Sequence, residues 1–99
     1  MVKQIRPSKQ FTVVAYDIAD DQRRQKLAKL LEKHGTRVNY SVFECFLRPS
    51  ELEKLKQKIN SLTHAGTDSV LFYTLCLSCL AQRQQLGCYN NVPPMILKV

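Results

Sequence analysis

Asp17 is the residue whose surroundings point most directly to chemistry. It closes an apolar run, Phe-Thr-Val-Val-Ala-Tyr-Asp over residues 11–17, and two more acids follow at Asp20 and Asp21. A carboxylate at the end of a strand suits a hard cation such as Mg²⁺, which activates water against a phosphodiester. One carboxylate makes a poor site, so two Asp17 side chains would share the ion if a dimer axis passes near this strand end. The structural alternative is that Asp17 caps the next segment or pairs with Arg24.

Basic side chains follow Asp17 in the sequence. Guanidinium groups bind phosphate in a bidentate fork, which makes this series suitable for nucleic-acid contacts, although solvated surface charge explains most such residues. We predict nucleic-acid contacts for Arg23, Lys26, Lys29 and Arg37. Tyr40 and Phe43 are candidates for base stacking, whereas strand aromatics more often belong to the core. The whole basic series is Arg23, Arg24, Lys26, Lys29, Lys33 and Arg37.

Four cysteines raise a second chemical hypothesis. The spacing Cys76-x-x-Cys79 is half of a zinc-ribbon pattern, and Cys88 or Cys45 would have to complete it. A second close pair of ligands is missing, because His34 and His64 lack ligand spacing to each other. Buried free thiols are therefore the default interpretation and a zinc site is the alternative.

Charge is the unusual property of the composition. The 99 residues include 15 Lys and Arg against 8 Asp and Glu, which gives a formal net charge of +7. This excess favours polyanionic partners through counterion release, so nucleic acid is the leading candidate. A membrane surface is a minor alternative, because no basic amphipathic segment with aromatic anchors stands out. No apolar run resembles a signal peptide or reaches about 18 residues, so we expect a cytoplasmic protein.

The elements that must position these residues begin with a strand and a helix. Residues 11–18 are dense in β-branched and aromatic side chains, which predicts a strand ending near Asp17. Asp20 and Asp21 supply an N-cap and first-turn negative charge, and apolar residues then recur at helical spacing. Gly35 is a typical C-terminal stop, so a helix is predicted over residues 21–34.

The second half of the chain repeats this alternation. Residues 37–47 have strong β composition and form either one long strand or two strands that reverse near 39–41. Pro49 and Ser50 open a second helix, in which Ser50 and Glu53 have capping-box spacing. Residues 68–77 are the last β run.

The order β, α, β(β), α, β predicts an α+β, ferredoxin-like βαββαβ domain in which two helices cover one face of an antiparallel sheet. Yet the strands are apolar on both faces: Val13 alternates with Val14, and Tyr73 with Phe72. We therefore expect a homodimer packed sheet to sheet. We expect residues 1–99 to form one domain, with a C-terminal tail over 84–99 that adds a strand to the partner subunit, docks on it, or docks on another protein.

Three blocks of sequence carry a family resemblance. They are Val-Val-Ala-Tyr-Asp-Ile at residues 13–18, the basic block that begins at Arg23, and the block from Gly35 to Glu44 that contains Ser-Val-Phe-Glu. These blocks and their spacing resemble the small CRISPR-associated adaptation protein family, "Cas two". A later run, Asp-Ser-Val at residues 68–70 followed by Tyr73, Leu75 and the Cys76-x-x-Cys79 motif, resembles the end of many members, so the resemblance covers roughly residues 11 to 88.

The resemblance implies a dimeric adaptor that binds double-stranded DNA. In this family the dimer bridges the subunits of a larger integrase, "Cas one", during the capture of new CRISPR spacers. The family also implies a metal-dependent endonuclease activity on DNA or single-stranded RNA in some members, with Mg²⁺ bound at the aspartate matching Asp17. By motif position, Arg24, Arg37 and Phe43 would support that catalytic site. Because integration chemistry belongs to the partner, Asp17 would be dispensable for adaptation.

Overall fold

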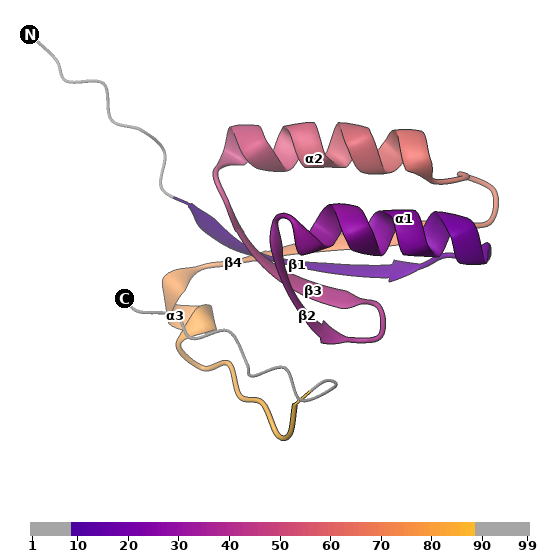
Figure 1. Cartoon of the computed structure of the whole chain (residues 1–99). Helices are drawn as coiled ribbons and strands as arrows, with labels where there is room; N and C mark the ends of the chain where they lie inside the picture. The colour runs from indigo at the N-terminus through magenta and orange to yellow at the C-terminus, as the bar shows by residue number, and fades with distance from the viewer. Residues whose placement is uncertain (1–8, 89–99) are drawn as a thin grey trace, which may run out of the picture.

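Four strands and two long helices alternate along the chain in a computed structural model that describes residues 9–88 (Figure 1). Neither these helices nor any other in this range is long and apolar enough to cross a membrane. The elements are β1 Gln10–Asp17, α1 Asp21–Glu32, β2 Gly35–Asn39, β3 Val42–Leu47, α2 Pro49–Leu62, β4 Ser69–Leu75 and the short α3 Leu77–Leu80.

The strands form one antiparallel sheet in the order β2-β3-β1-β4. The helices α1 and α2 lie on one side of this sheet, and α3 lies on the other side (Figure 1). This topology confirms the predicted ferredoxin-like βαββαβ fold. The expected extra C-terminal strand falls largely on residues 89–99, which lie outside the described residues, and residues 84–88 contain no helix or strand.

The first helix begins as predicted and ends earlier. Asp20 is its N-cap, and the Asp20 carboxylate accepts the backbone N–H of Arg23 at 2.9 Å. The helix ends at Glu32, and Gly35 already belongs to β2, so Gly35 is not a helix stop. A glycine is required at position 35 because the two strands pack closely there: a Cβ would lie 2.3 Å from the Glu44 carbonyl oxygen of the neighbouring strand.

The β run after α1 is two strands, and the turn between them is small. Asn39 ends β2, and its side-chain oxygen accepts the backbone N–H of Tyr40 at 2.7 Å, which stabilises the reversal without a glycine. The capping box of α2 lies two residues earlier than predicted, at Arg48 and Glu51 instead of Ser50 and Glu53. Glu51 accepts the backbone N–H of Arg48 at 2.9 Å, because Pro49 occupies the first helical position.

The face of the sheet beneath α1 and α2, here called the closed face, carries the core. Val14 of β1 is fully buried and lies between Phe43 of β3 and Phe72 of β4 in the strand register. Leu27 and Leu55 bring the two helices onto this row. The buried cluster is Val14, Tyr16, Ile18, Leu27, Ala28, Leu31, Phe43, Cys45, Leu47, Leu52, Leu55 and Ile59.

The opposite face, here called the open face, is apolar but only partly covered. Leu71 and Tyr73 of β4 remain 51% and 54% exposed. The chain after β4 turns back over one end of this face, where Leu80 is buried and Arg83 pairs with the buried Glu44. The open face consists of Phe11, Val13, Ala15 and Asp17 of β1, Val42, Glu44 and Phe46 of β3, and Leu71, Tyr73 and Leu75 of β4.

Candidate nucleic-acid interface

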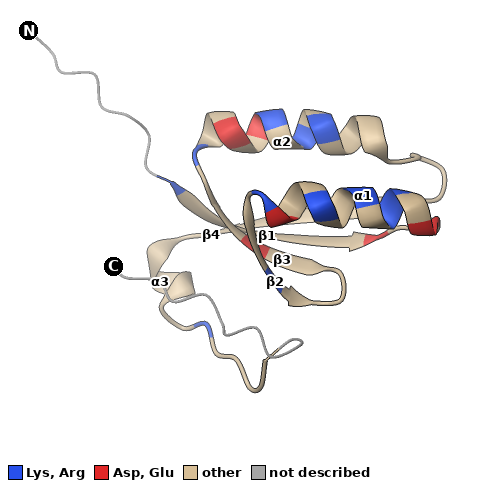
Figure 2. Cartoon of the chain, in the orientation of Figure 1, with Lys and Arg blue, Asp and Glu red and all other residues tan. Residues whose placement is uncertain are grey.

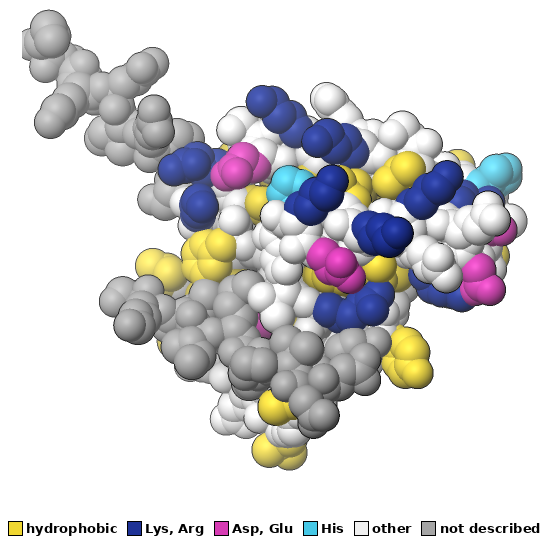
Figure 3. Space-filling view, in the orientation of Figure 1, with side chains coloured by type: hydrophobic (Ala, Val, Ile, Leu, Met, Phe, Trp, Pro, Cys, Tyr) yellow, Lys and Arg dark blue, Asp and Glu magenta, His cyan; other side chains and the backbone are white. Residues whose placement is uncertain are grey.

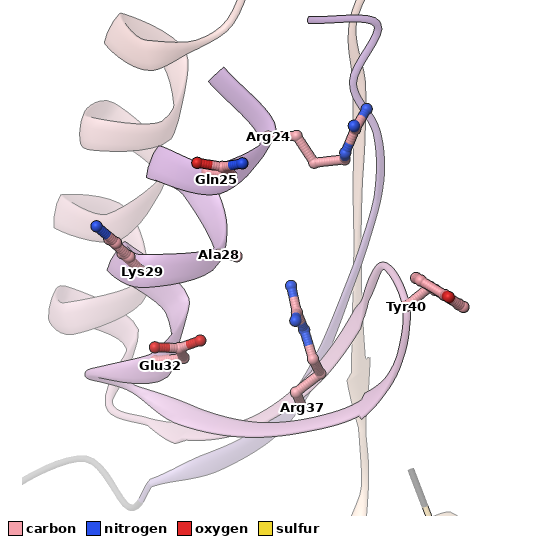
Figure 4. A pocket seen from close by; sticks show the side chains of 7 residues that line it. All are labelled: Arg24, Gln25, Ala28, Lys29, Glu32, Arg37 and Tyr40. Carbon is pink, nitrogen blue, oxygen red and sulfur yellow. The ribbon is translucent and has the colours of Figure 1, made fainter. Parts of the chain in front are cut away.

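A pocket of about 370 Å³ between α1 and the β2–β3 hairpin collects three of the predicted site residues. Arg24 and Lys29 reach it from α1, and Arg37 reaches it from β2 (Figure 4). Figure 4 shows the Arg37 side chain extending from β2 into the space between α1 and Tyr40. Three cations and one acid, Glu32, give this pocket a net positive lining suited to a phosphate group. The pocket is lined by Arg24, Gln25, Ala28, Lys29, Glu32, Arg37 and Tyr40.

Phe43 positions Arg37 and does not stack on bases. Its side chain is fully buried in the core, so the stacking hypothesis for this residue is wrong. The Arg37 guanidinium lies 5.3 Å from the Phe43 ring centroid, a cation–π contact, and its Nη2 donates to the Tyr16 hydroxyl at 3.3 Å. Tyr16 in turn stacks on Phe43 with ring centroids 6.3 Å apart. The Phe43 ring and the Tyr16 hydroxyl therefore orient the Arg37 guanidinium.

Arg24 is tied to the start of its own helix. Its Nη1 donates to the Ile18 carbonyl at 3.0 Å, and its Nη2 forms an ion pair with Asp21. The alternative in which Asp17 pairs with Arg24 is therefore wrong. An arginine three residues after an acid lies on the same helix face, so Asp21 is the nearer partner.

Arg23, predicted to bind nucleic acid, is engaged inside the protein. Its Nε and Nη2 donate to the Asp68 carboxylate at 2.9 and 3.2 Å. Asp68 also accepts the backbone N–H of His64 at 2.9 Å and that of Ala19 at 3.2 Å. The Arg23 hydrogen bond, followed by the His64 amide, lowers the pKa of Asp68 far below its ordinary value. The Arg23–Asp68 ion pair joins α1 to the residue before β4, and it was not predicted from the sequence.

Lysines make the helical layer positive. Lys26 and Lys29 are exposed on α1, and Lys54 and Lys58 are exposed on α2. Figure 2 shows that Lys and Arg gather on the two helices, whereas the strands carry few of them. In Figure 3 their side chains spread over the helical side of the molecule. The predicted contact residues Lys26 and Lys29 therefore lie on an exposed basic surface.

Asp17 lies apart from this surface. Its side chain is exposed at the end of β1, and by strand alternation it belongs to the open face with Val13 and Ala15, whereas Tyr16 faces the helices. Asp17 and Phe43 therefore belong to opposite faces of the sheet, and the catalytic set that the resemblance implies, Asp17 with Arg24, Arg37 and Phe43, stays a prediction.

The carboxylates of one chain do not fit a magnesium site. Within residues 9–88, no three His, Cys, Asp or Glu side chains gather so as to hold a metal ion. Asp20 caps α1, Asp21 pairs with Arg24, and Asp68 is clamped by Arg23. Asp17 would therefore be a lone carboxylate ligand, whereas hard cations take about six oxygen ligands. A metal at Asp17 would need its remaining ligands from water, a substrate phosphate or a second chain.

The cysteines differ in burial. Cys45 is buried in the core, and burial raises the pKa of its thiol to about 11. Cys76, Cys79 and Cys88 are exposed, so the expectation of buried thiols is wrong for these three. The geometry of residues 9–88 also shows no zinc-like cluster around them.

Comparison with known proteins decides the family. Residues 10–83 match the family model described as CRISPR associated protein Cas2. The chain belongs to the Cas2 family. It is 47% identical over 70 residues to a "CRISPR-associated endoribonuclease Cas2 3" of Synechocystis sp., covering 71% of this chain and 76% of that protein. The resemblance identified from the sequence blocks is thereby confirmed.

Solved structures agree with this assignment. The crystal structure of Streptococcus pyogenes Cas2 is similar with a TM-score of 0.70 at 32% identity, over 78% of this chain and 99% of that one. A chain of a partial Cas6-RT-Cas1–Cas2 complex is similar with a TM-score of 0.67 at 30% identity, over 78% of this chain and 90% of that one. The ferredoxin-like architecture is therefore shared with Cas2 structures.

Proposed function

We propose that this chain is a cytoplasmic, dimeric adaptor of CRISPR spacer acquisition that binds double-stranded DNA and bridges the subunits of a Cas1 integrase. The observation that carries the proposal is the exposed basic surface of α1 and α2, with the pocket of Arg24, Lys29 and Arg37 at its edge. The match to a chain of a complex whose name includes Cas1 and Cas2 supports the integrase as partner.

The basic surface suits a duplex better than a single base. Lysines on two neighbouring helices present ammonium groups to successive backbone phosphates, which gives affinity without reading sequence. Phe43 is buried and unavailable for stacking on an unpaired base, whereas the other stacking candidate, Tyr40, is 80% exposed at the pocket and its stacking role stays a prediction. Arg37, supported by Phe43 and Tyr16, supplies a fork for one phosphate at the pocket.

Dimerisation through the open face completes the proposal. Leu71 and Tyr73 are more than half exposed on a sheet face whose other residues are largely apolar. A second copy of the chain buries this surface by sheet-to-sheet packing about a two-fold axis.

We further propose that the tail over 84–99 docks on the partner subunit. A groove of about 440 Å³ lies at the end of the open face and is lined by Phe46, Leu75 and Leu77 among others. Its apolar lining suits the apolar side chains of the tail.

The dimer has a direct test. Leu71→Glu places a charge in the proposed interface, and we expect it to raise the dimer dissociation constant at least about tenfold, since a buried unpaired charge is costly. Sedimentation equilibrium measures the change. Ser61→Glu on α2 adds the same charge at an exposed site away from the sheet. Equal dissociation constants for both variants would place the interface elsewhere.

The DNA-binding proposal is tested by the salt dependence of duplex binding, measured by fluorescence anisotropy. Lys29→Gln removes one pocket cation, and we expect it to reduce the slope of log K against log salt by about 1. The matched control is Lys9→Gln, which removes one exposed charge at the far end of β1. Asp17→Ala should leave binding unchanged. Identical slopes for the two lysine variants would contradict a role for the pocket.

A second candidate function is metal-dependent cleavage of RNA or DNA phosphodiesters. It is favoured by relatives that are named endoribonuclease or endonuclease, and by the exposure of Asp17. Mg²⁺ would be held by the two Asp17 carboxylates of a dimer. The test is cleavage by wild type and by Asp17→Asn with and without Mg²⁺. Cleavage that persists in the variant would indicate a contaminating nuclease, and loss of cleavage with intact duplex binding would support both functions.

A further inference from the structure

The turn after β4 holds the two cysteines of the Cys76-x-x-Cys79 motif on one exposed side. The Cys76 carbonyl accepts the backbone N–H of Leu80 at 2.9 Å, so residues 76–80 form a single helical turn. Positions three apart on such a turn have neighbouring side chains, within the Cα separation that a disulfide bridges. Both thiols are exposed to solvent.

The surroundings of the Cys76 sulfur favour the thiolate. Its Sγ lies 3.1 Å from the Ser78 hydroxyl. Either atom can donate in this contact. Hydrogen bonding to the Ser78 side chain, followed by the backbone and the side chain of Cys79, lowers the pKa of Cys76 to about 7. The contact with Cys76 raises the pKa of Cys79, because its thiol proton is held by the Cys76 sulfur. One cysteine is thus an attacking thiolate and its neighbour is a protonated resolving thiol.

We propose that Cys76 and Cys79 form a reversible, redox-active dithiol that exchanges with low-molecular-weight disulfides. The Cys76 thiolate attacks one sulfur of the small disulfide RSSR, whose S–S bond breaks and releases RS⁻ while a Cys76–SR mixed disulfide forms. Cys79 then loses its proton to solvent and attacks the Cys76 sulfur, which expels the second RS⁻. Counted from the dithiol, the protein loses two electrons and two protons, one when the Cys76 thiolate forms and one from Cys79; the two RS⁻ take up these protons, so RSSR is reduced to two RSH.

The other cysteines of the described chain do not share this arrangement. Cys45 is buried, with a thiol pKa of about 11, so it is protonated and shielded at neutral pH. A zinc site would need four ligands, and among residues 9–88 no third Cys, His or acid joins the pair in a metal-binding cluster. The pair also lies beside the open face, because Cys76 lines the apolar groove with Leu77 and Leu80. Closing the disulfide would fix the turn at the edge of this groove.

The experiment equilibrates the purified protein with mixtures of reduced and oxidised glutathione, quenches with acid, alkylates free thiols and maps the products by mass spectrometry. We expect wild type to close a Cys76–Cys79 bond and Cys79→Ser to stop as a glutathione mixed disulfide on Cys76. Cys88→Ser is the matched control and should close like wild type. All replaced side chains are exposed, and circular dichroism checks that each variant is folded.

A rate measurement adds an independent readout. At pH 7 about half of a thiol with a pKa of about 7 is thiolate, against about 3% of an ordinary cysteine. Lower intrinsic nucleophilicity offsets part of this gain, so Cys76 should react with iodoacetamide about threefold faster than a cysteine in an unstructured peptide. A stable mixed disulfide on wild-type Cys76 would overturn the proposal. Retention of one zinc per chain by wild type but not by Cys76→Ser would also overturn it, in favour of a metal site.

Discussion

The two faces of the sheet are built from the same strands but have different covers. On the closed face, Val14 lies between Phe43 and Phe72 beneath two helices, and the first two are fully buried. One residue earlier, Val13 lies between Glu44 and Tyr73 on the open face, where Tyr73 is more than half exposed. A single chain therefore completes one face and leaves the other partly exposed.

Each face also has its own ion pair to a covering segment. Arg23 of α1 reaches Asp68 on the closed side, and Arg83, in the chain after α3, reaches Glu44 on the open side. Both carboxylates are nearly or fully buried. One ion pair thus holds α1 on the closed face, and the other holds the segment after α3 on the open face. Apolar side chains are well buried only on the closed face.

The largest expected loss of stability comes from truncating a core side chain of the closed face. Phe43→Ala should lower the free energy of unfolding by about 3–5 kcal/mol, because it opens a cavity in the core. Tyr73→Ala on the open face should cost at most about 1 kcal/mol in dilute, monomeric protein. Urea unfolding followed by circular dichroism measures both. Similar losses for the two variants would show that the faces are equally complete within one chain.

The contrast between the faces was partly readable from the sequence. Alternation of Val13 with Val14 and of Tyr73 with Phe72 predicted a sheet that is apolar on both sides, and two helices could cover only one of them. The same period-2 argument, applied to β3, would have placed Phe43 in the core with Cys45 and Leu47. The family blocks drew attention to Phe43 as a site residue instead, so its positioning role was missed.

Both long-range ion pairs escaped sequence reasoning for a physical reason. Arg23 and Asp68 are 45 residues apart, and Arg83 and Glu44 are 39 apart, so neither pair has a local spacing rule. Helix periodicity places neighbours three or four residues apart, as in Arg24 with Asp21, but it is silent on contacts set by the topology. From the sequence, Arg23 was as good a candidate for a phosphate contact as Lys29, whereas in the fold its guanidinium donates to Asp68; its contact with nucleic acid stays a prediction.

The second prediction concerns the attachment of the C-terminal segment to the open face. Glu44→Gln removes the charge that pairs with Arg83, and we expect a loss of about 1.5–3 kcal/mol, typical of a charged hydrogen bond in a buried site. Amide hydrogen exchange should increase over residues 77–88 and stay constant in α1. Unchanged exchange over 77–88 would mean that Leu80 packing, not the ion pair, holds this segment.

The smallest effect is expected at the closed-face ion pair, because Arg23 remains about one-third exposed and solvent screens the interaction. Its distinctive property is pH dependence. The pKa of Asp68 is lowered on folding, so the carboxylate stabilises the native state fully above its unfolded pKa of about 4 and loses this contribution as pH falls below that value. The stability gap between wild type and Asp68→Asn should be constant from about pH 5 to 7 and shrink toward about pH 2.

Urea titrations of wild type and Asp68→Asn across this pH range measure that gap, and using the difference removes the contributions that the two proteins share. The Ala19 amide donates to Oδ1 of Asp68 and the His64 amide donates to Oδ2, so the single side-chain oxygen of the variant can accept only one of them. The gap therefore includes one lost amide hydrogen bond as well as the charge facing Arg23, and its pH dependence reports the ionisation of Asp68. A gap that stayed constant down to about pH 2, or widened there, would mean that Asp68 acts through shape and neutral hydrogen bonds. In that case the helix α1 would be held on the closed face by apolar packing alone, and the parallel between the two ion pairs would fail.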